Sequence, residues 1–542
     1  MLNRIILAVF SVTFSFSVSA KLCSEQTNQN YNDTAKILAS GWGFTPTNTR
    51  YLDSDTVAID KDSVSKLTLK WAFRFPRANK ARSQPAITED TIFVGSQKGK
   101  LYALDRETGC IRWQYKTSDG FGISPEIRTA ISIGYAGAGG ERLLFFGDFF
   151  GNAHAVRAAT GERVWKTSLD DHIAATITGS PTLHNGILYV PVSSFEVALP
   201  AIPFYSCCKF RGSVAALDAK SGEIIWQQYV SEAPTKQGRN KLFVSQYGPS
   251  GAPIWNSPTI DEKRGLLYVG TGENYSHPAT NTSDAILAMD LKNGEMKWVF
   301  QATSNDAWNF GCALPGAINC PENPGLDLDF GASPLLATLA NGKDMIFAGQ
   351  KNGVVYALDP DNGGQLIWQK RVGRGGALGG IHWGLTFDGE RLYVPVSDYL
   401  QEIPGLNAPL PEDPSMSKVP GLYALSPTDG SVLWETPSLP ICENREECDP
   451  GLSAAPSAIP GVIFSGALDG HLRAYDAVNG KVLWQVDTTA EVPTTDGKIG
   501  KGGSLDADGP VIVGNQLYVN SGYKIFGEKA GNVFLVYSTN EN

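Results

Sequence analysis

Short stretches of alternating apolar and polar residues recur along the whole chain, each interrupted by a turn. One phrase appears seven times: LYALDRETGCIRW (101–113), AHAVRAATGERVW (153–165), VAALDAKSGEIIW (214–226), ILAMDLKNGEMKW (286–298), VYALDPDNGGQLIW (355–368), LYALSPTDGSVLW (422–434) and LRAYDAVNGKVLW (472–484). In most copies a strand pattern runs into Asp or Asn followed by Gly, which favour a tight turn, and a second strand pattern ends in Trp. Each copy therefore predicts a β-hairpin within a repeat architecture.

Two further strand patterns precede most of these hairpins, as in SPTLHNGILYV (180–190) and GPVIVGNQLYV (509–519). Each unit is thus expected to hold four strands. An eighth Trp, Trp71 in LTLKWAFRF, lies upstream of the first complete unit, and the last strand pattern, NVFLVYS (532–538), has no Trp after it. We predict that the two ends of the chain build one blade together. The fold is then an all-β, eight-bladed β-propeller, with residues 21–542 as a single domain.

Composition agrees with a turn-rich β protein and excludes one class of partner. The chain has 542 residues, of which only 18% are charged, and it contains 58 Gly and 12 Trp. Its net charge is -10 and no Lys/Arg cluster occurs, so the basic surface that nucleic-acid binding requires is missing. Nucleic acid is not an expected partner.

Residues 1–20 have the pattern of a secretory signal peptide. Arg4 precedes an apolar stretch, and small residues end the segment at Ser19 and Ala20, after which we expect cleavage. No other run reaches the roughly 20 apolar residues that a membrane span requires. We therefore expect a periplasmic or secreted protein without a membrane span.

Eight cysteines in an exported chain predict disulfide bonds. Cys312 with Cys320, and Cys442 with Cys448, are natural local pairs. The adjacent residues 207 and 208 are expected to form a vicinal disulfide, which leaves residues 23 and 110 for each other. The chain has no Cys-x-x-Cys-His motif, so we expect no haem attached to it.

Long insertions are expected on one face of the propeller. In an antiparallel blade, the connection from the second to the third strand and the connection to the next blade leave on the same face, where a site would be built. Polar and aromatic residues outside the repeat fall in these connections, namely Arg82, Arg128, Thr178, Ser193, Glu196, Cys207, Cys208, Trp255, Glu273, Asn274, Asp306, Trp308, Asn309, Lys351, His382 and Trp383. Carboxylate and amide oxygens without a His/Cys cluster suit Ca²⁺. Cations beside unpaired Trp rings suit a planar, anionic aromatic cofactor.

An ordered set of motifs at these positions resembles a known family. The motifs are TGSP (178–181), SSFE (193–196), APIW (252–255), GTGEN (270–274), NDAWN (305–309), QKNG (350–353) and GGIHW (379–383). With the blade phrase, which corresponds to the family's tryptophan-docking motif, they resemble the pyrroloquinoline quinone (PQQ)-dependent quinoprotein alcohol dehydrogenases. Within that family the chain is most similar to the enzymes that act on polyvinyl alcohol, and the resemblance extends from residue 48 to residue 527.

The resemblance implies a role for each matched residue. Trp255 would be the floor on which the quinone stacks, Thr178 and Ser193 would hydrogen-bond to its edge, and Arg128 would meet one of its carboxylates. Lys351 would donate to the reactive quinone oxygen. The remaining implied cofactor contacts are Arg82, Cys207, Cys208, His382 and Trp383, and the implied Ca²⁺ ligands are Glu196, Glu273 and Asn274.

The motifs depart from the family pattern at three places. Asn309 stands where methanol-oxidising members carry an aspartate that serves as base, so Asp306 is our hypothesis for the base. Glu273 replaces an asparagine and would keep the ion site charged. The Cys207–Cys208 pair follows the strand that carries Glu196 instead of lying in an earlier loop, and two roles stay open for it: covering the cofactor or bracing the long loop.

The implied reaction is the PQQ- and Ca²⁺-dependent oxidation of an alcohol, with secondary alcohols or polyvinyl alcohol as the expected substrates. Because we expect no haem in this chain, a separate acceptor such as a cytochrome c would take the electrons. Two alternatives stay open: a non-enzymatic propeller scaffold of outer-membrane protein assembly, and a PQQ enzyme for sugars or primary alcohols. The loops at 400–420 and 493–508 carry no recognisable specificity pattern.

Overall fold

The computed structural model describes residues 21–29, 31–118, 124–137, 139–399, 413, 415–442 and 445–539. The signal segment 1–20 and most of the 400–420 loop lie outside the described residues.

Within the described ranges, thirty-two strands form eight antiparallel blades, and in each blade neighbouring strands pair in order from the innermost outward. Blade 1 is β3 (Ala86–Thr88), β4 (Thr91–Gly95), β5 (Lys100–Asp105) and β6 (Ile111–Lys116); blade 2 is β7 (Ser132–Tyr135), β8 (Arg142–Gly147), β9 (Asn152–Arg157) and β10 (Arg163–Ser168). Blade 3 is β12 (Thr182–His184), β13 (Ile187–Ser194), β14 (Ser213–Asp218) and β15 (Ile224–Tyr229); blade 4 is β19 (Thr259–Asp261), β20 (Leu266–Gly270), β22 (Ala285–Asp290) and β23 (Met296–Gln301). Blade 5 is β24 (Leu335–Thr338), β25 (Asp344–Gly349), β26 (Val354–Asp359) and β27 (Gln365–Arg371); blade 6 is β28 (Thr386–Phe387), β29 (Leu392–Val396), β30 (Gly421–Leu425) and β31 (Val432–Pro437). Blade 7 is β32 (Ser457–Ile459), β33 (Val462–Gly466), β34 (His471–Asp476) and β35 (Val482–Asp487); blade 8 is β38 (Val511–Val513), β39 (Gln516–Ser521), β40 (Val533–Ser538) and β2 (Thr68–Arg74).

Shorter strands and helices lie outside the four-stranded core of each blade. β1 (Ile37–Ala39) extends blade 1 and β11 (Ala175–Thr176) extends blade 3, while short pairs are formed by β16 (Thr235–Arg239) with β17 (Ser245–Gly248), β18 (Ser250–Gly251) with β21 (Asn274–Ser276), and β36 (Glu491–Pro493) with β37 (Ile499–Lys501). The described helices are α1 (Glu25–Gln29), η1 (Val64–Lys66), η2 (Glu196–Ala201) and η3 (Pro360–Asn362).

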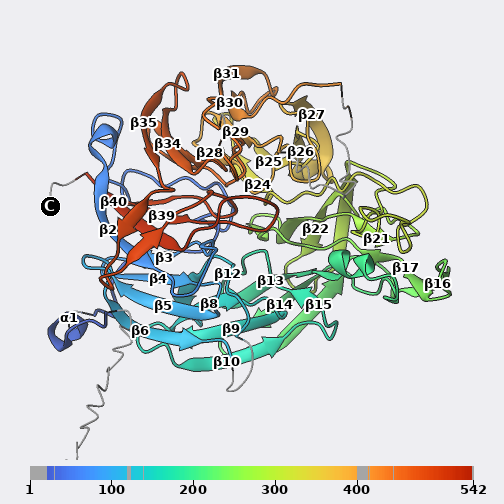
Figure 1. The fold of residues 1–542 in the computed structure, drawn as a ribbon, viewed down its shortest axis with the longest axis horizontal. Coiled ribbons are helices and arrows are strands. Elements are labelled where there is room, and N and C mark those ends of the chain that lie inside the picture. The colour runs from blue at the N-terminus through green and yellow to red at the C-terminus, as the bar shows by residue number, and fades with distance from the viewer. Residues whose placement is uncertain are drawn as a thin grey trace, which may run out of the picture.

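Blade 8 joins the two ends of the described chain. β2 pairs with β40 along its whole length, from Thr68 opposite Ser538 to Arg74 opposite Val533, and Figure 1 shows the blue β2 beside the red β39 and β40. The prediction of an all-β, eight-bladed propeller is confirmed.

At seven of the eight blade junctions in the described structure, the repeated Trp packs against a glycine of the next blade. A Cβ on Gly161 of blade 2 would lie 2.4 Å from the Trp113 ring of blade 1, so only glycine leaves room for that indole. The same contact recurs around the ring, ending with Gly109 against Trp71. The Trp113 indole N–H also donates to the Ala158 carbonyl of blade 2, at 3.1 Å. Both repeat residues are therefore used for packing between blades.

A segment near the N-terminus fills the central channel. The inner strands of neighbouring blades contact one another; for example, β19 contacts β24 and β28 contacts β32. These strands therefore surround the channel. Residues 46–50 accept backbone hydrogen bonds from four inner strands, at residues 260, 336, 387 and 458. The buried Arg50 guanidinium donates to the Pro456 carbonyl at 2.7 Å and lies 4.8 Å from the Trp42 ring centroid. This segment therefore occupies the space between these inner strands.

All eight cysteines form the four expected disulfides: Cys23–Cys110, Cys207–Cys208, Cys312–Cys320 and Cys442–Cys448. Within the described ranges, no helix is long and apolar enough to cross a membrane.

Candidate active site

A cavity of about 200 Å³ lies at the centre of the propeller and collects many of the residues singled out in the sequence. Eight of the predicted site residues line it: Arg128, Thr178, Ser193, Trp255, Glu273, Lys351, His382 and Trp383. The remaining wall is largely apolar and aromatic, with Phe195, Tyr275, Trp308 and Phe310 among its members.

The repeat explains why distant residues meet here. In every blade, one residue stands four positions before the first residue of the inner strand: 82 before a strand that starts at 86, 128 before 132, 178 before 182, 255 before 259, 331 before 335, 382 before 386, 453 before 457 and 507 before 511. Equivalent positions in a propeller face the same axis. In chain order these positions hold Arg82, Arg128, Thr178, Trp255, Gly331, His382, Ser453 and Ala507. We call them the axial ring.

Trp255 is held rigidly in this ring. Its indole N–H donates to Oδ2 of Asp329 at 2.8 Å, and its ring meets the Trp383 ring edge to face with centroids 5.0 Å apart. A Cβ on Gly331 would lie 1.8 Å from a ring atom of Trp255, so the glycine makes room for the indole. A fixed indole in a cavity is a stacking surface for a planar ligand.

Three carboxylates next to Trp255 form a candidate metal site. One oxygen each from Glu273, Asp327 and Asp329 can be chosen so that all three lie within 4.8 Å of one another. Lys351 lies beside the cluster, because its Nζ is 2.8 Å from Asp327 and 3.2 Å from Asp329. Carboxylate oxygens in this number are the ligands that Ca²⁺ prefers.

The charged groups of this cluster shift one another's pKa values. Burial and the negative charge of Asp329 raise the pKa of Glu273 well above its usual range. Burial likewise raises the pKa of Asp327, although Lys351 acts in the opposite direction. Burial alone would lower the pKa of Lys351, but the two aspartates raise it, so its ammonium stays charged. A cation bound here would displace the protons of these acids.

Asp306 lies behind this cluster. It does not line the cavity, and its carboxylate accepts hydrogen bonds from the backbone N–H groups of Asp327 at 3.3 Å and Leu328 at 3.0 Å. Asp327 has a left-handed backbone with φ of 59°, which is uncommon for a non-glycine residue. Asp306 thus stabilises the bend that points Asp327 at the cavity, and our hypothesis of Asp306 as base gains no support from this geometry.

Two arginines follow one another in the axial ring. Arg128 lines the cavity, lies 5.4 Å from the Trp383 centroid and has no ion pair among the described residues. Burial and the neighbouring Arg82 lower its pKa to about 10, which still leaves it cationic at neutral pH. Arg82 stays behind the wall, where its Nε lies 2.6 Å from Glu126, while its Nη1 has no hydrogen-bond partner in the part of the chain that the structure describes. The pair provides positive charge for an anionic ligand.

The side chains of Glu196 and Asn274 form hydrogen bonds with neighbouring loop residues. The Glu196 carboxylate accepts from the Tyr205 hydroxyl at 2.7 Å and from the backbone N–H of Phe210 at 2.7 Å. Asn274 donates to the Ser250 carbonyl and accepts from the Thr280 N–H. Neither residue is part of the three-carboxylate group or lines the cavity.

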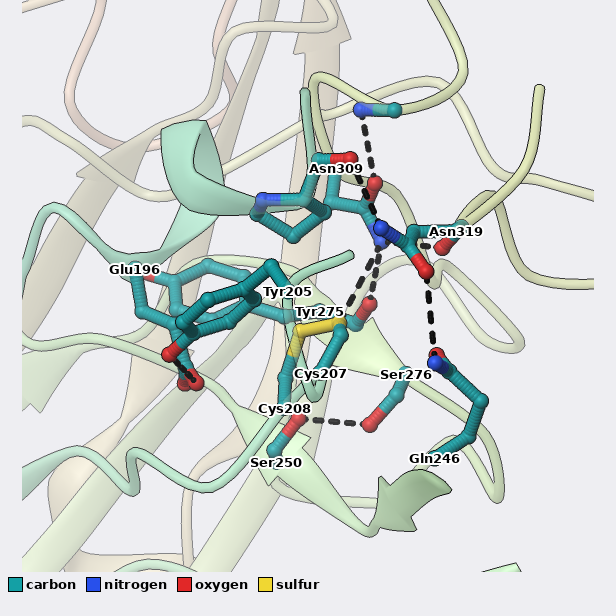
Figure 2. Close-up of a disulfide and its surroundings, with 12 residues drawn as sticks. Glu196, Tyr205, Cys207, Cys208, Gln246, Ser250, Tyr275, Ser276, Asn309 and Asn319 are labelled. Atoms are coloured by element: carbon teal, nitrogen blue, oxygen red, sulfur yellow. Dashed lines mark hydrogen bonds between the residues drawn. A yellow bond between two sulfur atoms is a disulfide. The ribbon is translucent and has the colours of Figure 1, made fainter. Parts of the chain in front are cut away.

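The vicinal disulfide also lies behind the wall. Figure 2 shows Cys207 and Cys208 between Glu196, Tyr275 and Asn309. Both cysteines are fully buried and pack in one apolar cluster with Tyr275, which does line the cavity. Asn309 donates to the Tyr275 carbonyl at 2.9 Å and accepts from the Gly311 N–H at 2.8 Å. The pair therefore packs behind Tyr275, and Asn309 holds the Tyr275 backbone by a hydrogen bond.

Asp327 and Asp329 are functional candidates that the sequence reasoning missed. They lie in GLDLDFGASP (325–334), where acidic and apolar residues alternate like a strand directly before an inner strand. The signal that could have found them is the axial ring, since Asp329 precedes ring residue Gly331 by two positions.

The donor set fits an anionic quinone with a Ca²⁺ ion. The fixed Trp255 face suits the planar ring, the unpaired Arg128 suits a carboxylate, and the acidic cluster suits the ion. An eight-bladed propeller with this set of residues around its axis defines the class of propeller quinoprotein dehydrogenases.

Comparison with known proteins agrees with that class. The family described as glucose/ethanol/alcohol dehydrogenase, PQQ β-propeller domain, matches residues 40–376, and the outer membrane protein assembly factor BamB family matches residues 351–532. A polyvinylalcohol dehydrogenase of Pseudomonas sp is 40% identical over 490 residues, which cover 89% of this chain and 73% of that protein. A polyvinylalcohol dehydrogenase of Sphingopyxis sp. (strain 113P3) is 38% identical, covering 89% of this chain and 72% of that protein.

The fold agrees with a solved quinohemoprotein alcohol dehydrogenase from Comamonas testosteroni. Its TM-score is 0.68 at 19% identity, and the match covers 96% of this chain and 83% of the other. The chain belongs to the PQQ-dependent alcohol dehydrogenase family. When bound, PQQ supplies an acceptor for two electrons, because its quinone is reduced to the quinol.

Proposed function

We propose that this protein oxidises secondary alcohols, polyvinyl alcohol among them, and passes the electrons to a separate acceptor such as a cytochrome c. The observation that carries the proposal is the convergence of Trp255, Lys351 and three carboxylates in one cavity whose remaining wall is largely apolar and aromatic. The two polyvinylalcohol dehydrogenases at 40% and 38% identity support the substrate class.

In this proposal Asp327 is the catalytic base. It lines the cavity, unlike Asp306, and with the ion bound its carboxylate is deprotonated and can accept the hydroxyl proton of a bound alcohol. Glu273 and Asp329 hold the Ca²⁺ ion, with Asp327 as the third oxygen donor. Lys351 keeps its positive charge beside Asp327 and faces the oxygen atoms on which negative charge develops.

The other site residues take supporting roles. Trp255 stacks the cofactor, Arg128 meets one carboxylate, and Thr178 and Ser193 hydrogen-bond its edge. Phe195, Trp308 and Phe310 line the cavity where the substrate chain would enter. An apolar wall favours a substrate that is rich in methylene groups over a charged one.

We also propose that the protein acts outside the cytoplasm after loss of residues 1–20. The signal pattern supports this location, as do the four disulfides, which form in oxidising compartments. The remaining residues, 21–542, would act as one domain.

The test is dye reduction by the purified mature protein supplied with PQQ and Ca²⁺. We expect reduction with secondary alcohols and polyvinyl alcohol, and none without Ca²⁺. Reduction with glucose or primary alcohols alone would refute the proposed substrate class. No reduction with any substrate would contradict the proposed activity and favour a scaffold.

A further inference from the structure

His382 is the one histidine in the axial ring, and it lies against the stacking surface. Its ring centroid is 5.7 Å from that of Trp255 and 5.1 Å from that of Trp383. The side chain lines the cavity although only 8% of the residue is exposed. A buried imidazole can present either a donor or an acceptor to a ligand, depending on which nitrogen carries the proton.

Two buried polar residues behind His382 determine that choice. Nδ1 of His382 lies 2.8 Å from the Ser453 hydroxyl oxygen, and that hydroxyl donates to Oδ1 of Asp506 at 2.6 Å. Ser453 and Asp506 are 1% and 5% exposed. The three residues come from three successive connections, before blades 6, 7 and 8.

The direction of these hydrogen bonds follows from counting protons. The Ser453 hydroxyl has a single hydrogen, which goes to Asp506, so towards His382 it acts as an acceptor. Nδ1 must then carry the imidazole proton. Burial, together with the charge of Lys351, lowers the pKa of His382 to about 3, so the ring is neutral at physiological pH and Nε2 has no proton.

We propose that Asp506 and Ser453 are positioning residues that fix His382 in the Nδ1–H tautomer and so make Nε2 a hydrogen-bond acceptor in the cofactor cavity. Nε2 has no hydrogen-bond partner among the described residues, so it is available to a ligand. The group it recognises is an N–H or O–H donor on a planar ligand stacked on Trp255. In the oxidised cofactor that donor is the pyrrole N–H, and this step rests on the cofactor assignment of the proposed function.

The arrangement does not depend on the protonation of Asp506. Burial and the charge of Glu528 raise the pKa of Asp506 to about 7, so its carboxyl is partly protonated at neutral pH. Oδ1 also accepts the backbone N–H of Ala507 at 2.7 Å. A proton is therefore placed on Oδ2, and Oδ1 stays an acceptor for Ser453 in both forms.

The tautomer is measured directly on the unmodified protein by ¹⁵N NMR. The chain has six histidines, and long-range ¹H–¹⁵N spectra of ¹⁵N-histidine-labelled protein report the protonation of both ring nitrogens. The His382 signals are assigned from their loss in His382→Asn. We expect a protonated Nδ1 and a bare Nε2 between pH 6 and pH 8. A protonated Nε2 would overturn the proposal, whether or not the protein binds PQQ.

Variants test the link to the cofactor. Ser453→Ala should shift the tautomer towards Nε2–H and weaken PQQ binding by about tenfold, measured by quenching of Trp fluorescence in the Ca²⁺-loaded protein. Asp506→Asn keeps an oxygen that accepts from Ser453 and Ala507, so its tautomer and affinity should match the unmodified protein. Ser457→Ala removes a buried hydroxyl of β32 that bonds to the Pro510 carbonyl and is the control for general loosening.

These results separate the two proposals. If the unmodified protein does not bind PQQ while His382 is in the Nδ1–H form, the cofactor role fails and the tautomer assignment stands. If PQQ binds but Ser453→Ala changes neither the tautomer nor the affinity, the positioning roles of Ser453 and Asp506 are refuted. Equal losses in Ser453→Ala and Ser457→Ala would refute them as well.

Discussion

Replacing Asp327 by Asn tests its role as the catalytic base while leaving the groups around it in place. Asn has the same shape and tolerates the left-handed backbone that Asp327 adopts at φ of 59°. The two backbone N–H groups bound by Asp306 are unchanged. Lys351 retains its contact with Asp329 at 3.2 Å, so the ammonium stays in place. The substitution therefore removes one proton acceptor and one negative charge.

The magnitude follows from the role of a general base. Such a residue contributes about 10²- to 10⁴-fold to the rate, which corresponds to about 2.7–5.4 kcal/mol of transition-state free energy. We expect kcat to fall by that factor in PQQ-loaded Asp327→Asn at saturating Ca²⁺. Dye reduction measures the rate, and a calorimetric Ca²⁺ titration shows whether the ion site is still filled.

Asp306→Asn is the matched control, because this variant changes the same chemical group one layer behind the cavity. Its amide oxygen still accepts one of the two backbone N–H groups, so kcat should fall by less than about tenfold. A large loss in Asp306→Asn with a normal rate in Asp327→Asn would refute the assignment of Asp327 and restore Asp306 as the base.

Three further changes test the surroundings of the site. Gly331→Ala should weaken PQQ binding by about 5- to 150-fold, which corresponds to about 1–3 kcal/mol of overpacking, because its Cβ would overlap Trp255; unchanged cofactor titration would contradict this. Glu196→Gln should cost about 1–3 kcal/mol of unfolding free energy in denaturant titrations yet leave Ca²⁺ affinity within twofold, whereas loss of Ca²⁺ binding would return Glu196 to the ion site. Neither buried carboxylate oxygen of Asp284 has a hydrogen-bond partner among the residues described, and burial raises the pKa of Asp284 well above its usual range, so its ionisation favours the unfolded state as pH rises. Asp284→Asn should raise the melting temperature at pH 8 by an amount that vanishes near pH 4, and an equal shift at both pH values would disprove the account.

The fold could be predicted from the sequence because each blade repeats the same packing solution. The Trp at the end of one hairpin needs a glycine in the next, and this pairing recurs at a spacing that can be counted along the chain. The residues of the axial ring follow from the same register, which is why Trp255, Arg128 and His382 lie together at the cavity.

The ion cluster could not be predicted in the same way. Its ligands come from long connections whose course is set by contacts outside the repeat. Motif matching proposed Glu196, Glu273 and Asn274 as ion ligands and Asp306 as the base, and only Glu273 of these lies in the cluster. Backbone N–H groups of neighbouring loops hydrogen-bond to the carboxylates of Glu196 and Asp306. Asp327 and Asp329 reach the cavity because the chain bends at Asp327, and a bend of this kind has no strong sequence signature outside glycine.

The central claim is that the ion and the cofactor share one cavity, with Glu273, Asp327 and Asp329 around the ion. A crystal structure of the protein loaded with PQQ and Ca²⁺, with an anomalous difference map recorded at long wavelength, tests this directly. We predict a single Ca²⁺ peak about 2.3–2.6 Å from carboxylate oxygens of all three residues, beside a quinone stacked on Trp255. A peak at Glu196, or a quinone bound away from Trp255, would contradict the account.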